Sequence, residues 1–127
     1  LVLGNYEKKD IQEKYDGDIK KYGEVLCEKG FDQFSDEPFE TDLYTSFEDS
    51  QKITLGHEPI ATNNARLKFG TKYALFGHIH GRQRIKPFGL DVGVDTNNFT
   101  PCRASKEIRF FLNALDKGYY DEEVWVQ

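Results

Sequence analysis

Apolar positions recur along the chain with two different spacings, which predict where helices and strands lie. Between residues 9 and 30 they recur at helical spacing, at Ile11, Tyr15, Ile19, Tyr22, Val25 and Leu26. Gly30 would end this helix, and Gly17 and Gly23 weaken its middle enough to allow a break there. The N-terminal quarter of the chain is therefore expected to be helical.

Shorter apolar runs dominate the middle of the chain and predict strands. Residues 38–47 and 51–57 are separated by the polar segment Glu48-Asp49-Ser50, which predicts a β-hairpin. Further strands are expected at residues 1–3, 72–76, 83–88, 90–94 and 123–126, and a loop is expected over the polar residues 59–70. A second helix is predicted from Ser105, whose hydroxyl would cap it, to about Lys117. Central strands flanked by helices predict an α/β fold, a mixed sheet covered by helices.

Composition limits the classes of function. The 127 residues carry a net charge of −5 at pH 7, which argues against general nucleic-acid binding, because that binding needs Lys and Arg to neutralise phosphates. A small phosphorylated substrate stays compatible, since a bound metal would invert the local field. No apolar run approaches the roughly 20 residues that span a bilayer, so no membrane partner is expected. Cys27 and Cys102 are too few for a disulfide framework, and a reducing, cytoplasmic setting is expected.

All three histidines of the chain follow apolar runs that read as strands. His57 follows residues 53–56, and His78 and His80 follow residues 73–77. Imidazole is a good ligand for zinc, iron, nickel and related ions, and the glycines on both sides of His78 and His80 let the backbone turn so that these two rings face different ions. Asn5, directly after Gly4, offers an amide oxygen at an equivalent position. These donors predict half of a two-metal site.

Three segments, in this order, resemble motifs of the calcineurin-like metallophosphoesterases. Residues 4–7 (Gly-Asn-Tyr-Glu) resemble a variant of the Gly-Asn-His-Asp/Glu motif, residues 55–59 the single-histidine segment, and residues 77–80 (Gly-His-Ile-His) the Gly-His-x-His motif. The segment 92–101 is similar to that of small bacterial and phage members. The resemblance covers essentially the whole chain and implies the family's four-layer α/β/β/α sandwich. Residues 1–127 would be the C-terminal portion of a single such domain, lacking its N-terminal strands, because the chain has no methionine and opens within a strand pattern.

The resemblance also implies roles for individual residues. Asn5, His57 and His78 would bind one divalent ion and His80 the other, the ions being Mn, Fe, Ni or Zn. Tyr6 stands where the family has a catalytic histidine, and Glu7 follows it as the acidic residue that steers it. The family's Asp-x-His and Gly-Asp-x-x-Asp motifs lie upstream of residue 4 and are not among these residues. The implied activity is hydrolysis of a phosphomonoester or phosphodiester by a metal-activated water.

Arg82 closely follows the histidine pair and is a candidate to hold a substrate phosphate, since guanidinium suits that geometry. An ion pair with a neighbouring carboxylate is the other interpretation of Arg82, and packing against the sheet is the other interpretation of Tyr6.

Two further functions stay open. In the first, the chain is a catalytically inactive member of the family that uses the sandwich as a binding or assembly module, and the departure at Tyr6 favours this alternative. In the second, the chain is a mononuclear metal-binding protein whose site is built from Asn5, His57 and His78. The exposed edges of a truncated sandwich would favour a homo-oligomer.

Overall fold

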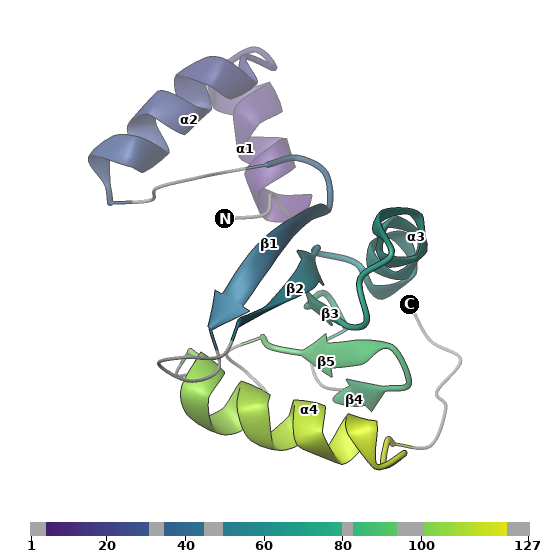
Figure 1. The fold of residues 1–127 in the computed structure, drawn as a ribbon. Coiled ribbons are helices and arrows are strands. Elements are labelled where there is room, and N and C mark those ends of the chain that lie inside the picture. Colours follow the sequence, from purple (N-terminus) through teal and green to yellow (C-terminus); the bar gives the residue numbers. More distant parts are fainter. Residues whose placement is uncertain (1–4, 31–34, 45–49, 80–82, 94–100, 122–127) are drawn as a thin grey trace. The chain divides into compact units, whose positions relative to one another are not determined.

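The chain divides into two compact units, residues 1–37 and residues 38–127. The computed structural model describes residues 5–30, 35–44, 50–79, 83–93 and 101–121, which Figure 1 colours along the sequence. The strands expected at residues 1–3 and 123–126 lie outside the described residues. In the described part, no helix combines the length and the apolar character needed to cross a bilayer.

The N-terminal unit is a pair of helices, α1 (Asn5–Lys14) and α2 (Ile19–Glu28). Asp16 and Gly17 separate them in left-handed conformations, with φ of 50° and 79°, and the carboxylate of Asp18 then caps α2 by accepting from the N–H of Lys21. A small core of Ile11, Leu26 and Tyr22 holds the two helices together. The predicted helical region is confirmed, with its break at the first of the two glycines.

The C-terminal unit is built on a five-stranded mixed sheet in the order β1-β2-β3-β5-β4. Its strands are β1 (Phe39–Tyr44), β2 (Ser50–Leu55), β3 (Ala74–Phe76), β4 (Ile85–Lys86) and β5 (Gly89–Asp91). β1 and β2 form the predicted antiparallel hairpin, with Phe39 opposite Leu55. β3 runs parallel to both β2 and β5, and β4 closes the edge antiparallel to β5. The mixed α/β class is confirmed.

Residues 59–69 form a helix, α3 (Pro59–Phe69), so the loop expected at 59–70 is wrong. Pro59 occupies the first helical position, where its fixed φ suits the helix, and Gly70 ends α3 in a left-handed conformation, its N–H bonded to the carbonyl of Arg66. The buried side of α3 consists of Pro59 and Thr62 rather than aliphatic residues. The segment therefore lacks the apolar periodicity that would have indicated a helix.

The helix predicted from Ser105 to Lys117 is present as a π-helical turn, Ala104–Ile108, followed by α4 (Arg109–Asp116). The expected cap is wrong, because Ser105 lies inside the first turn. The carboxylate of Glu107 instead accepts from the N–H of Arg103 at 2.9 Å and pairs with its guanidinium at 3.1 Å. The N-cap is thus Arg103, two residues before the Ser105 that the sequence indicated.

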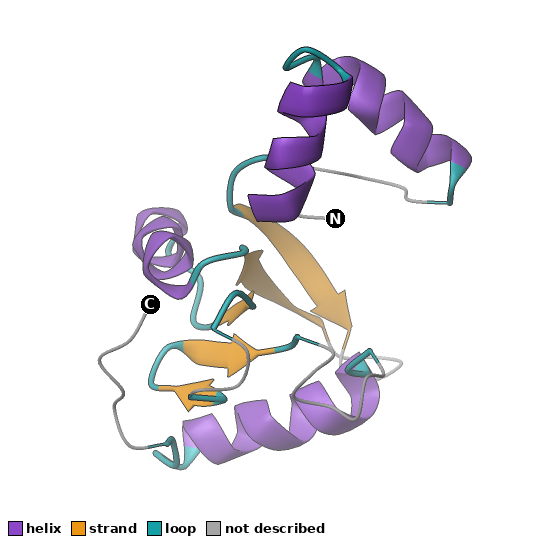
Figure 2. Ribbon diagram, turned by 180° about the vertical axis from the view of Figure 1, so that it is seen from behind, coloured by secondary structure: helices purple, strands orange, loops and turns teal. Residues whose placement is uncertain are grey.

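The two faces of the sheet are covered by different helices. Ile53, Tyr73, Leu75 and Leu90 form an apolar core with the buried side of α4, whose members include Ile108, Leu112 and Leu115. α3 packs against β2 and β3 on the opposite face, where a methyl group on Gly56 would collide with Thr62. Figures 1 and 2 show the sheet between the two helices from opposite sides. The described part of this unit thus has one sheet with a helix on each face.

Candidate metal centre

His57 and His78 meet at one edge of the sheet, where two neighbouring parallel strands end. β2 continues through Gly56 into His57, and β3 continues through Gly77 into His78. The parallel ladder extends past both strands, because Gly56 N–H donates to the carbonyl of Leu75 at 3.0 Å and Gly77 N–H donates to that of His57 at 2.9 Å. The two imidazoles are thereby brought together from positions 21 residues apart in the chain.

The nitrogen atoms of the two rings are in direct contact. Nε2 of His57 lies 3.1 Å from Nδ1 of His78, and the ring centroids are 4.9 Å apart at an interplanar angle of 72°. Two nitrogens that bind one tetrahedral ion at 2.0–2.1 Å would be about 3.3 Å apart. The observed separation is therefore slightly shorter than that of two ligands of one such ion, and two imidazoles supply only part of a metal's ligand set.

The backbone at His78 is in the left-handed region, with φ of 73°. Residues other than glycine adopt this conformation uncommonly, although histidine does so more often than most, and it costs roughly 1–3 kcal/mol. The turn is held on its far side by Ile79, whose N–H donates to the carbonyl of Gly77 at 2.9 Å and whose side chain is buried. Such strain at a side chain that meets another histidine is typical of a functional position.

The strand that carries His78 is fixed at its other end by a polar contact with α4. Tyr73, just before β3, donates from its hydroxyl to Oδ1 of Asp116 at 2.8 Å, and Lys72 pairs with the same oxygen at 2.7 Å. Burial, followed by the hydrogen bond to Asp116, raises the pKa of Tyr73 to about 12, so the phenol stays a donor at neutral pH. The hydrogen bonds from Lys72 and Tyr73 lower the pKa of Asp116, so its carboxylate stays ionised.

Of the residues predicted for the site, the structure brings together His57 and His78. Asn5, Tyr6 and Glu7 occupy the first turn of α1 and belong to the other compact unit, and His80 and Arg82 lie outside the described residues. Among the described residues, no group of three or more His, Cys, Asp or Glu side chains is placed to hold a metal ion. The described centre thus consists of two imidazoles.

One carboxylate at the same edge of the sheet has no role in the sequence-based prediction. Asp91 ends β5, directly beside Phe76 at the end of β3, and its side chain is only 2% exposed. Its Oδ1 accepts from the N–H of Gly93 at 2.9 Å. Only the strand order β2-β3-β5 places Asp91 at the edge that carries the histidines, and the sequence alone does not contain that order.

Comparison with known proteins gives no match to this chain, whether with protein-family models, with curated proteins or with solved structures. The interpretation of the centre therefore depends on the residues described above.

Proposed function

We propose that this chain belongs to a metal-dependent phosphoesterase of the calcineurin-like class, with that family's α/β/β/α sandwich. The observation that supports the proposal best is the 3.1 Å separation of Nε2 of His57 and Nδ1 of His78 at the ends of two parallel strands. The motif resemblance of residues 4–7, 55–59 and 77–80 identified the same two histidines independently of their geometry.

In this proposal, His57 and His78 hold one divalent ion and His80 holds a second. Asn5 belongs to the other compact unit and is assigned to the first ion by the motif resemblance alone. Two such ions would supply Lewis-acid stabilisation of the phosphoryl oxygens and a water of lowered pKa. The chain's own groups then position the substrate. Arg82 would bind the phosphate through paired N–H donors, and Tyr6, oriented by Glu7, would donate a hydrogen bond to a phosphate oxygen.

The phenol of Tyr6 has a consequence for substrate choice. A group with a reference pKa of about 10 gives up a proton to a leaving alkoxide less readily than an imidazolium does. Esters with good leaving groups need little protonation, so we expect aryl phosphoesters to be cleaved much faster than alkyl ones. Equal rates on p-nitrophenyl and alkyl diesters, measured with the longest natural form of the protein, would refute this role of Tyr6.

The proposal is tested by metal content and activity measured together. The protein is analysed for bound metals, and hydrolysis of bis-p-nitrophenyl phosphate is followed before and after chelation. His57→Ala and His78→Ala should each weaken metal affinity by more than about tenfold, since loss of even a group that only orients a ligand costs 10- to 100-fold. Cys27→Ala is the matched control, because it removes an exposed potential ligand from the other unit. Unchanged metal affinity in both histidine variants would rule out the centre.

A binding or assembly module without catalysis is the second candidate, and the tyrosine at position 6 favours it. It predicts metal bound through His57 and His78 with no hydrolysis of either ester class. The number of metal ions bound per chain distinguishes a mononuclear site from the proposed two-metal site. One ion per chain in the longest natural form would indicate a mononuclear site.

A further inference from the structure

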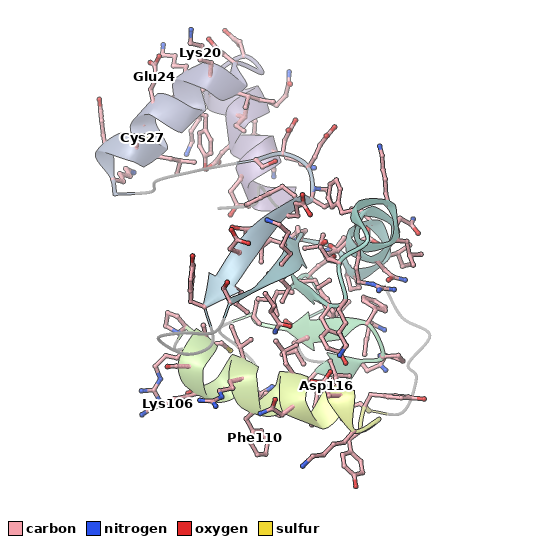
Figure 3. All side chains as sticks on the ribbon, viewed as in Figure 1. Lys20, Glu24, Cys27, Lys106, Phe110 and Asp116 are labelled. Atoms are coloured by element: carbon pink, nitrogen blue, oxygen red, sulfur yellow. The ribbon has the colours of Figure 1, made fainter. Side chains whose placement is uncertain are left out.

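The solvent-facing side of α4 combines cations with an exposed aromatic ring. Lys106, Arg109, Phe110, Asn113 and Lys117 follow one another at helical spacing on this side and are all exposed; we call them the α4 outer face. Phe110 is 69% exposed and projects away from the sheet (Figure 3). Its ring rests edge-on against that of Phe111, with centroids 5.3 Å apart. The exposed ring of Phe110 is thus in contact with the ring of Phe111 on one side.

The cations of this face are not neutralised by their own helix. Both acidic side chains of the segment are engaged elsewhere, Glu107 with Arg103 and Asp116 with Lys72 and Tyr73. In the part of the chain that the structure describes, no carboxylate pairs with Lys106, Arg109 or Lys117. A locally positive surface therefore exists on a chain whose net charge is −5.

A cavity of about 340 Å³ opens on this face, lined by Phe110, Asn113, Ala114, Lys117 and Tyr119. The left-handed turn at Gly118, with φ of 83°, folds the chain back, and the N–H of Tyr119 bonds to the carbonyl of Ala114 at 3.0 Å. The surface that these residues turn toward the cavity is almost entirely apolar, and it includes the exposed side chains of Phe110 and Tyr119; its volume is at the small end of ligand-site volumes. Aromatic rings stack on a nucleobase, and the cations outside the cavity can bind phosphate.

We propose that the α4 outer face and its cavity bind single-stranded nucleic acid, with one base in the cavity and the backbone along Lys106, Arg109 and Lys117. A strand fits better than a free mononucleotide, because Lys106 and Lys117 are separated by about 16 Å along the helix axis, too far to share one phosphate. A duplex does not fit, since its bases are stacked and cannot enter. Three cations imply weak, strongly salt-dependent binding, in keeping with the net charge.

The test uses a short fluorescein-labelled oligothymidylate, the full chain and fluorescence anisotropy in the presence of EDTA. With three phosphates neutralised, the slope of log K against log salt should be about −2, which makes binding roughly 20-fold weaker between 50 and 200 mM salt. Phe110→Ala should weaken binding at least about fivefold through lost stacking. Lys117→Gln should reduce the slope by about 0.7.

Two matched variants control for surface changes elsewhere. Tyr44→Ala removes a ring that is 64% exposed on β1, and Lys68→Gln removes an exposed cation from α3; both should bind like the unmodified chain. Each variant is first shown to keep the circular dichroism spectrum and thermal midpoint of the unmodified chain, which its exposed position favours.

Several results would overturn the proposal. The first is that the chain does not bind the oligonucleotide, and the second is that Phe110→Ala and Tyr44→Ala bind it equally well. The third is that the chain binds thymidine monophosphate, a duplex or a polyglutamate peptide as tightly as it binds the oligonucleotide. Because EDTA removes divalent ions, His57→Ala should bind the strand normally, so this site and the proposed phosphoesterase centre succeed or fail separately.

Discussion

Gly56 stands directly before His57, and replacing it with alanine should destabilise the sheet unit. A methyl group on Gly56 would lie 2.8 Å from Cβ and Cγ2 of Thr62 on α3 and still closer to Oγ1. Thr62 is completely buried, and its hydroxyl donates to the carbonyl of Glu58 at 2.6 Å. The threonine side chain therefore has no free volume to move into, and β2 and α3 would have to separate.

The expected cost of Gly56→Ala follows from overpacking. Extra carbon in a filled interior costs about 1–3 kcal/mol, and displacement of the Thr62 hydroxyl would add about 1 kcal/mol for its hydrogen bond. We therefore expect a loss of about 2–4 kcal/mol in the free energy of unfolding. Gly77→Ala is the matched control, since it precedes the other site histidine and the nearest atom to its methyl group would be the His57 carbonyl oxygen at 3.9 Å. Its stability should be unchanged or raised by up to about 1 kcal/mol, because alanine restricts the unfolded chain.

Urea unfolding of both glycine variants measures this difference. In a Thr62→Ala background, Oγ1 and Cγ2 of residue 62 are absent and no longer collide with the methyl group of Ala at position 56. Gly56→Ala should therefore lower the free energy of unfolding by at least about 1 kcal/mol less in that background. If Gly56→Ala is as stable as Gly77→Ala, or costs the same in both backgrounds, the collision with Thr62 is not what requires glycine at position 56.

Three further predictions concern α4 and its contacts. Tyr73→Phe removes the hydroxyl that donates to Asp116 and should lower the free energy of unfolding in urea by about 1 kcal/mol; no change would show that the bond is not stabilising. Hydrogen bonds from Arg103 lower the pKa of Glu107 to about 2 from a usual value of 4.5, so its contribution to stability is complete above that usual value and is lost as pH falls toward 2. The thermal midpoint should therefore fall less in Glu107→Gln than in the unmodified chain between about pH 5 and pH 2.5, and an equal fall would contradict this. Leu112→Ala empties a buried core position and should cost about 2–5 kcal/mol in urea unfolding; a cost below 1 kcal/mol would mean that α4 does not pack on the sheet as described.

The elements that the sequence predicted correctly are those whose buried side is aliphatic or aromatic. The hairpin, β3 and α4 bury residues such as Ile53, Leu75 and Leu112, and their spacing in the chain reflects the period of the element. α3 departs from this rule because Thr62 is the residue it buries against Gly56. Pro59 and Gly70 do mark its two ends, so end signals would have indicated a helix where periodicity did not.

The candidate site could be predicted from the sequence only in part. His57 and His78 each lie one glycine past the end of a strand, so local sequence was enough to place both at strand ends. Asp91 was missed because its position depends on β5 lying beside β3 while β4 takes the outer edge. That order is set by tertiary pairing of strands only two or three residues long, and such short strands carry little register information.

The strained turn at His78 distinguishes between two explanations of the histidine pair. The left-handed conformation costs roughly 1–3 kcal/mol, and glycine would form the same turn with less strain. A hydrogen bond between two imidazoles returns only about 1 kcal/mol, which does not offset that cost. A complete structural zinc site contributes far more, about 10–16 kcal/mol. Under the proposed function, a metal ion bound by His57 and His78 together with further ligands would therefore offset a strain that a shared proton does not.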